Sequence, residues 1–171
     1  MEALFERFQT TIARDLKLNL ERLLTEGALD KTDAHLALLA TAASVGIPPL
    51  VDYAQNQLAA DSGLGQEEII EAREAAAIMG MLNTYYRFKH MVDKEDDYRS
   101  AGLRMTSLAK PKLGKKRFEM LSFGVSVLNG CETCIRAHEN VLRDSEVPVE
   151  QIHDLARIAA VVKGLKPLMV S

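Results

Sequence analysis

Apolar residues recur at helical spacing along almost the whole chain, and this periodicity limits the possible folds more than any other feature. Leu36, Leu39, Ala40 and Ala43 are an example, because residues three and four apart share one face of a helix. Sustained alternation of apolar and polar residues is missing, and no Asn-Gly or Asp-Gly turn lies between β-branched runs. The sequence therefore predicts an all-α fold.

Capping and breaking residues divide this pattern into helices. Thr32 is a suitable N-cap, Gly46 a stop, and Gly130 a left-handed stop before the next helix. We expect helices from Thr32 to Gly46 and over about 49–60, 66–90, 116–128, 131–143 and 149–165, with partly loop structure from 93 to 114. The expected inner seam of the long third helix consists of Ile70, Ala77, Met81, Tyr85 and Phe88. The whole chain, 1–171, then forms one compact domain, a bundle of about seven or eight helices.

Composition excludes several classes of protein. The 171 residues include 21 basic and 24 acidic side chains, so no basic surplus points to nucleic acid. The longest apolar stretches are too short to cross a bilayer, which predicts no membrane partner. Residues 1–15 carry charges among their apolar side chains, unlike a secretory signal, and we expect a cytoplasmic protein.

The chain also resembles itself after a shift of 84 residues, which carries Gly46 onto Gly130. The same shift aligns Asn56 with Asn140, Leu58 with Leu142, Arg73 with Arg157, Ala75-Ala76 with Ala159-Ala160, and Gly80 with Gly164. This predicts two similar helical units, about 33–82 and 117–166, related by a pseudo-twofold axis.

Cys131 and Cys134 are the only two cysteines of the chain. A secreted disulfide scaffold would use more cysteines at longer spacing, so the pair indicates redox chemistry or half of a metal site. On a helix, residues i and i+3 bring both sulfurs to one face, close enough for a disulfide. Since the pair follows Gly130, it lies in a first turn, where free amides and the helix dipole stabilise a thiolate. A thiolate can attack a peroxide, and the resulting sulfenic acid condenses with the second thiol.

Two further residues could carry protons at this pair. His138 lies four residues after Cys134 and shares its helix face, so its imidazole could accept the thiol proton. Glu119 lies on the preceding helix, followed at i+3 and i+7 by Ser122 and Ser126. Because a tight turn folds the two helices antiparallel, Glu119 could orient His138 or hold the proton.

Other interpretations of the same residues stay open. The cysteines could be an inert buried pair, or half of a zinc site that would need two more ligands. The spacing from His138 to His153 is too long for a zinc-finger pair, and we expect no metal. His35, His90 and His153 have no partner pattern and are interpreted as structural or exposed; the methionines and Tyr85-Tyr86 are assigned to the core or an interface.

The motif resembles the core of a known family. Phe118-Glu119 on one helix and Asn129-Gly130-Cys131-x-x-Cys134-x-x-x-His138-Glu139 on the next resemble the alkyl hydroperoxide reductase D family, within the carboxymuconolactone-decarboxylase-like group. The segments 75–81, 85–87 and 102–105 resemble the same proteins, so the similarity covers most of the chain.

This resemblance implies an antioxidant thiol peroxidase that reduces alkyl hydroperoxides, and also hydrogen peroxide or peroxynitrite. Cys134 would be the peroxidatic thiol, Cys131 the resolving thiol, and His138 with Glu119 the proton relay. No cofactor would be bound. Electrons would come from dihydrolipoamide on a lipoyl-bearing acyltransferase, a peroxiredoxin (alkyl hydroperoxide reductase C) would be a second partner, and the subunit would form a trimer or hexamer.

Two observations keep alternatives open. The helix dipole favours Cys131 as the more acidic thiol, whereas His138 and the resemblance favour Cys134. Thr133 stands where family members often have a histidine; its hydroxyl can donate a hydrogen bond but cannot relay a proton at neutral pH. A disulfide reductase or electron-transfer adaptor for a peroxiredoxin, a redox sensor, and a decarboxylase of the same group are the rival functions, although a decarboxylase would not need two cysteines.

Overall fold

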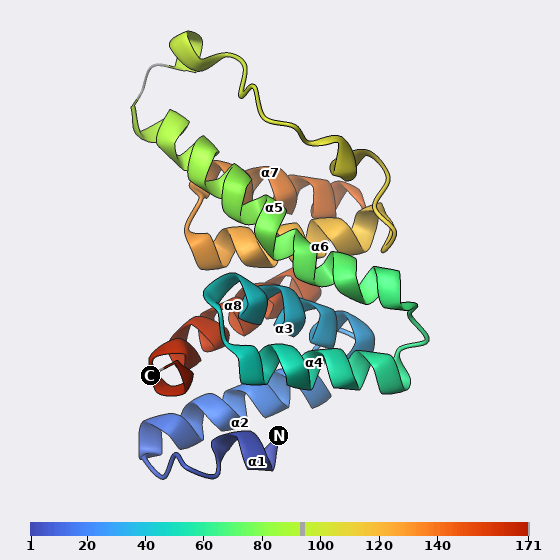
Figure 1. The fold of residues 1–171 in the computed structure, drawn as a ribbon, viewed down its shortest axis with the longest axis vertical. Coiled ribbons are helices and arrows are strands. Elements are labelled where there is room, and N and C mark those ends of the chain that lie inside the picture. Colours follow the sequence, from blue (N-terminus) through green and yellow to red (C-terminus); the bar gives the residue numbers. More distant parts are fainter. Residues whose placement is uncertain (93–94, 171) are drawn as a thin grey trace.

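The computed structural model describes residues 1–92 and 95–170, and in these residues it is a bundle of α-helices without strands (Figure 1). The prediction of an all-α fold with seven or eight helices is confirmed. The α-helices are α1 Glu2–Phe5, α2 Thr11–Thr25, α3 Lys31–Val45, α4 Pro48–Asp61, α5 Gln66–Met91, α6 Lys115–Asn129, α7 Glu132–Asp144 and α8 Val149–Met169. Two short 3₁₀ helices, η1 Glu95–Tyr98 and η2 Thr106–Ala109, lie between α5 and α6.

Helices α3 and α6 form the centre of the bundle (Figure 1). Helix α3 packs against α4, α5, α6 and α8, and α6 packs against α3, α5, α7 and α8. Both are buried on nearly every side, which suits their leucines, alanines and small polar residues, since a helix without a charged face is stable only when surrounded. The site helix α7 therefore lies directly on one of the two central helices.

The helix ends follow from local sequence, with one correction. Helix α3 begins one residue before Thr32, because the Asp30 carboxylate, and not Thr32, caps it by accepting the Asp33 amide hydrogen at 2.8 Å. Gly46 (φ 73°) and Gly130 (φ 65°) end α3 and α6 in the left-handed conformation that glycine adopts without a Cβ penalty. Gly130 thereby turns the chain straight into the CxxC segment.

The helix bounds repeat at the shift seen in the sequence. The bounds of α3, Lys31–Val45, map onto Lys115–Asn129, which are those of α6, and α4 and α5 begin within one residue of the mapped starts of α7 and α8. The packing is also reciprocal, because α3 touches α8 as α6 touches α5. A superposition of the units 33–82 and 117–166 stays a prediction.

The seam expected on α5 was wrong. Its buried residues are Ile69, Ala72, Ala75, Ala76, Met79, Leu82 and Asn83, while Ile70 and Phe88 are exposed. The helix carries apolar residues around much of its circumference, so periodicity alone could not select the face. Its true inner face lies on α3 and α6.

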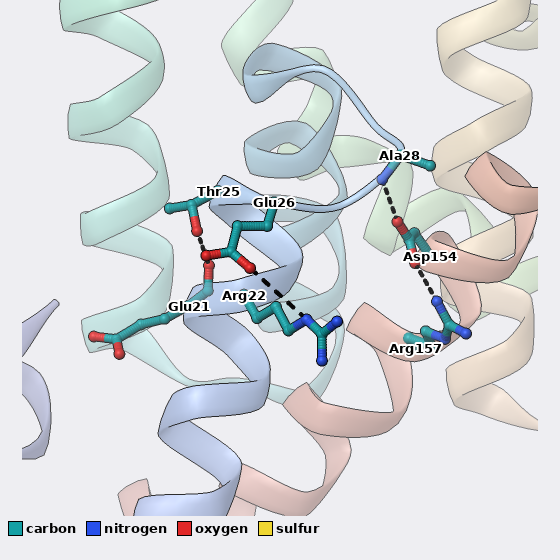
Figure 2. A network of polar contacts seen from close by, with 7 residues as sticks. All are labelled: Glu21, Arg22, Thr25, Glu26, Ala28, Asp154 and Arg157. Atoms are coloured by element: carbon teal, nitrogen blue, oxygen red, sulfur yellow. Dashed lines mark hydrogen bonds and ion pairs between the residues drawn. The ribbon is translucent and has the colours of Figure 1, made fainter.

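A buried aspartate joins α8 to the turn between α2 and α3 (Figure 2). The Asp154 carboxylate is 3% exposed and accepts hydrogen bonds from the Ala28 amide at 2.6 Å and from Arg157 at 2.9 Å. A Cβ on the neighbouring Gly27 would stand 2.8 Å from Asp154 Oδ2, so glycine is needed for this close approach. This network, at the end of the bundle that carries α2, fixes the N-terminal helices to the core.

Within the described residues, no helix combines the length and the apolar character that spanning a membrane requires.

Candidate active site

The turn after α6 sets the position of both cysteines. Beyond Gly130, the Cys131 amide donates to the Ser126 carbonyl at 3.2 Å, which holds Cys131 just before the first turn of α7. Cys134 lies within that turn, and a disulfide joins the two residues, with their Cα atoms 5.3 Å apart. The amides of a first helical turn have no intrahelical acceptor, so they can stabilise a thiolate formed there.

The two sulfurs differ in their access to solvent. Cys131 is completely buried, whereas Cys134 is 7% exposed and lines a surface cavity. A molecule that enters from solvent can therefore reach Cys134 while Cys131 lies behind it. Burial thus favours the same assignment as the resemblance, against the order expected from the helix dipole alone.

Glu119 and His138 meet across the interface of α6 and α7. Glu119 Oε2 lies 2.7 Å from His138 Nδ1, and each side chain is only about one fifth exposed (20% and 19%). A carboxylate can only accept, so Nδ1 carries the hydrogen and donates it. Nε2 is then the nitrogen left to accept a proton from another group.

The serines that follow Glu119 have different roles. Ser126 is fully buried and accepts a hydrogen bond from Asn83 Nδ2 at 2.9 Å. The Ser122 hydroxyl is also buried, and no hydrogen-bond partner is found for it among the described residues. Both serines of the polar stripe predicted on α6 therefore face inward, but only Ser126 makes a hydrogen bond to the turn that carries Cys131.

Asn83 connects α5 with this turn and was missed by sequence reasoning. It is 1% exposed, donates to Ser126, and accepts from Asn129 Nδ2 at 3.0 Å. Arg87, one turn later on α5, donates to the Asn129 carbonyl at 2.7 Å. The available signal was the pair of polar residues Asn83 and Arg87, which lie four residues apart and so share one face of α5, since buried polar groups need partners.

A cavity of about 300 Å³ opens in front of Cys134. Asn83, Thr133 and His138 line it together with Cys134. The remaining walls are apolar: Met79, Leu82 and Tyr86 on α5, Met105 and Leu108 around η2, and Ala137 on α7. The methionines and Tyr86 were assigned to the core or an interface, but Met79, Met105 and Tyr86 also line this cavity.

The structure brings Cys134, His138 and Thr133 to one cavity, with Cys131 and Glu119 directly behind them. His90 and His153 are exposed and lie outside it. His35 is buried on α3, where its Nδ1 lies 2.7 Å from the Lys31 carbonyl, and burial lowers the pKa of its imidazole in spite of that bond.

The zinc interpretation would need more ligands around the cysteines. Across residues 1–92 and 95–170, no group of three or more His, Cys, Asp or Glu side chains is arranged to hold a metal ion.

Comparison with known proteins identifies the family of this chain. Residues 99–169, which include all of these α6 and α7 residues, match the model of the carboxymuconolactone decarboxylase family. A protein from Anaeromyxobacter dehalogenans (strain 2CP-C), named alkyl hydroperoxide reductase AhpD, is 42% identical over 153 residues, 88% of this chain and 80% of the relative. Proteins of the same name from Maricaulis maris (40% identical, 93% of this chain and 91% of the relative) and Mycolicibacterium smegmatis (38%, 93% and 89%) match as extensively. With relatives of this similarity over most of its length, the chain belongs to the alkyl hydroperoxide reductase AhpD family.

Proposed function

We propose that this protein is a thiol peroxidase that reduces alkyl hydroperoxides, with Cys134 as the attacking thiol. The observation that carries the proposal is the arrangement of Cys134: one cysteine opens to an apolar cavity, its disulfide partner is buried behind it, and a histidine hydrogen-bonded to a carboxylate lines the same cavity. The names of the relatives support the same activity.

The oxidative half of the cycle uses only groups of this chain and the peroxide. His138 Nε2 takes the Cys134 thiol proton, and the Glu119 carboxylate stabilises the imidazolium through Nδ1. The thiolate attacks the terminal oxygen of R–O–OH, an S–O bond forms, the O–O bond breaks, and the alkoxide leaves with the proton from His138 as an alcohol. Cys134 is now a sulfenic acid.

Cys131 then resolves the sulfenic acid. Its sulfur attacks Cys134 Sγ, the S–O bond breaks, and hydroxide leaves with the Cys131 proton as water. The net reaction converts one hydroperoxide and two thiols into an alcohol, water and a disulfide. Because the Cα atoms are 5.3 Å apart, no large backbone movement is needed for the bond to form.

A dithiol must return the disulfide to two thiols. We propose dihydrolipoamide on an acyltransferase as this donor, which becomes the cyclic disulfide as Cys131 and Cys134 are reduced. A peroxiredoxin as a second partner, a trimeric or hexameric assembly and a cytoplasmic location belong to the same proposal; no bound cofactor is needed for any step.

Thr133 supports a second candidate function. It lines the cavity beside Cys134, yet its hydroxyl cannot relay protons as a histidine would. A chain of this kind could pass electrons from a dithiol to a peroxiredoxin disulfide, or sense oxidants, with little peroxidase turnover of its own.

The experiment measures consumption of cumene hydroperoxide with dihydrolipoamide as the only reductant. Native protein should turn over, Cys134→Ser should not, and Cys131→Ser should oxidise once and then stall. If the native CxxC is oxidised and reduced but peroxide is not consumed, the adaptor or sensor function is favoured. A decarboxylase would consume no peroxide in the native protein or in either variant.

A further inference from the structure

The surface of the cavity in front of Cys134 is almost entirely apolar. Methionine, leucine, alanine and tyrosine side chains line it together with Asn83, Thr133, Cys134 and His138. A ligand whose polar, oxygen-rich end reacts at Cys134 and whose hydrocarbon body lies against the apolar walls suits such a cavity. Hydrogen peroxide has no hydrocarbon body, so the cavity would then hold water against apolar walls.

The outer wall comes from the segment between α5 and α6, residues 99–114, which we call the strap. It starts at η1, beyond the end of α5, and returns along α5 towards the start of α6 (Figure 1). At one end, the Tyr98 ring packs on Phe88 with 5.1 Å between the ring centroids. At the other end, the Leu113 amide donates to Glu71 at 2.8 Å.

Between these two attachments, Met105 and Leu108 connect the strap to the body of the protein. Both side chains are partly buried, pack against the core, and line the cavity. Leu103 lies on the same strap with a similar degree of burial but does not line the cavity. Met105 and Leu108 are therefore the lining residues that the strap supplies, whereas the other lining residues belong to α5 and α7.

We infer that this cavity binds the hydrocarbon body of an organic hydroperoxide, and that Leu108 and Met105 determine which bodies fit. The inference rests on the proposed function, because it takes the peroxide to react at Cys134. A volume of about 300 Å³ equals roughly ten water molecules at ~30 Å³ each. An aryl or branched alkyl group of about that many heavy atoms, as in cumene hydroperoxide, fits this space.

The test compares Leu108→Phe, which fills part of the cavity, with Leu103→Phe as the matched control on the same strap. Pre-reduced protein is mixed with one equivalent of cumene hydroperoxide or hydrogen peroxide, and the second-order rate of disulfide formation is followed for each. This single-turnover rate does not depend on the reductant.

Loss of space for one or more methylene groups changes selectivity by about tenfold or more. We expect Leu108→Phe to slow the reaction with cumene hydroperoxide about tenfold more than the reaction with hydrogen peroxide, and Leu103→Phe to leave the ratio of the two rates unchanged. Leu108→Ala is the second variant: it should raise the rate with a larger probe, linoleic acid hydroperoxide, relative to cumene hydroperoxide.

The possible outcomes distinguish a failure of the cavity inference from a failure of the proposed peroxidase function. If native protein reacts with both peroxides but Leu108→Phe and Leu103→Phe have the same rate ratio as native protein, the cavity does not select the substrate and the inference is overturned while the peroxidase function stands. If no hydroperoxide oxidises Cys134, both are overturned.

Discussion

The hydrogen bond between Glu119 and His138 permits a quantitative prediction for Glu119→Gln. The Gln amide oxygen can still accept the Nδ1 hydrogen over 2.7 Å, so the ring keeps its orientation, but the negative charge that stabilises the imidazolium is lost. A hydrogen bond to a charged group contributes about 1.5–3 kcal/mol, and a neutral one about 0.5–1.5 kcal/mol. The difference, about 1–1.5 kcal/mol, corresponds to roughly a tenfold slower reaction.

The assay is the second-order rate of Cys134 oxidation by cumene hydroperoxide in pre-reduced protein. We expect about a tenfold loss for Glu119→Gln and a further loss for Glu119→Ala, which cannot hold the ring at all. Glu139→Gln is the matched control, because Glu139 follows His138 on α7 but pairs with the Arg143 side chain on the outer surface. A Glu119→Gln rate within twofold of the native rate, with folding intact, would refute the role of this carboxylate.

Three further predictions concern the support of the site and of the fold. Asn83→Ala should lower the free energy of unfolding by about 2–3 kcal/mol, because the two buried hydrogen bonds of Asn83, of 2.9 and 3.0 Å, are lost. Urea unfolding measures this free energy, and a loss below ~0.5 kcal/mol would contradict a stabilising role of these hydrogen bonds. Burial lowers the pKa of His35 below 6.5, so the folded state binds fewer protons there: its contribution to stability is full above pH 6.5 and is lost as the pH falls below it. His35→Gln should therefore flatten the decline of stability between pH 6.5 and more acidic values. A decline as steep as that of the native protein in thermal melts would argue against this. Gly130→Ala and Gly46→Ala should each lower the free energy of unfolding by about 1 kcal/mol, because alanine disfavours the left-handed φ angles of 65° and 73°. The added Cβ would meet nothing within 4 Å, so no steric clash adds to this loss. Unchanged melting temperatures would show that neither left-handed turn contributes to stability.

Much of the fold was predictable because its signals are local. Helical spacing, the glycine stops at Gly46 and Gly130, and the proline start of α4 each act over a few residues. The two ends of α7 were predicted within one residue for the same reason. The inner face of α5 was not, since a helix with apolar residues on several sides is oriented by what packs on it.

The candidate site, too, has a part that could be predicted from local sequence and a part that depends on tertiary packing. The i, i+3 and i+7 spacing of Cys131, Cys134 and His138 is a property of one helix, so its shared face could be read from the chain. The contact of Glu119 with His138 needed the crossing of α6 and α7, which the sequence indicates only through the turn at Gly130. Nothing local marks the apolar walls of the cavity, because α5 and the strap reach Cys134 only through tertiary packing.

The difference between the two cysteines is likewise a tertiary property. The dipole at the start of α7 acts on both thiols, and only the surroundings supplied by the rest of the bundle bury Cys131 and open Cys134 to the cavity. Sequence spacing could identify the pair, but only the packing of the bundle shows which of the two cysteines is accessible from the cavity.

The most direct test of this account is to trap the sulfenic acid in single-cysteine variants. Cys131→Ser and Cys134→Ser are each treated with less than one equivalent of cumene hydroperoxide in the presence of dimedone, and the modified residue is identified by mass spectrometry. We predict rapid labelling of Cys134 in Cys131→Ser and little labelling of Cys131 in Cys134→Ser. Labelling of Cys131 at an equal or greater rate would contradict the assignment of Cys134 as the attacking thiol.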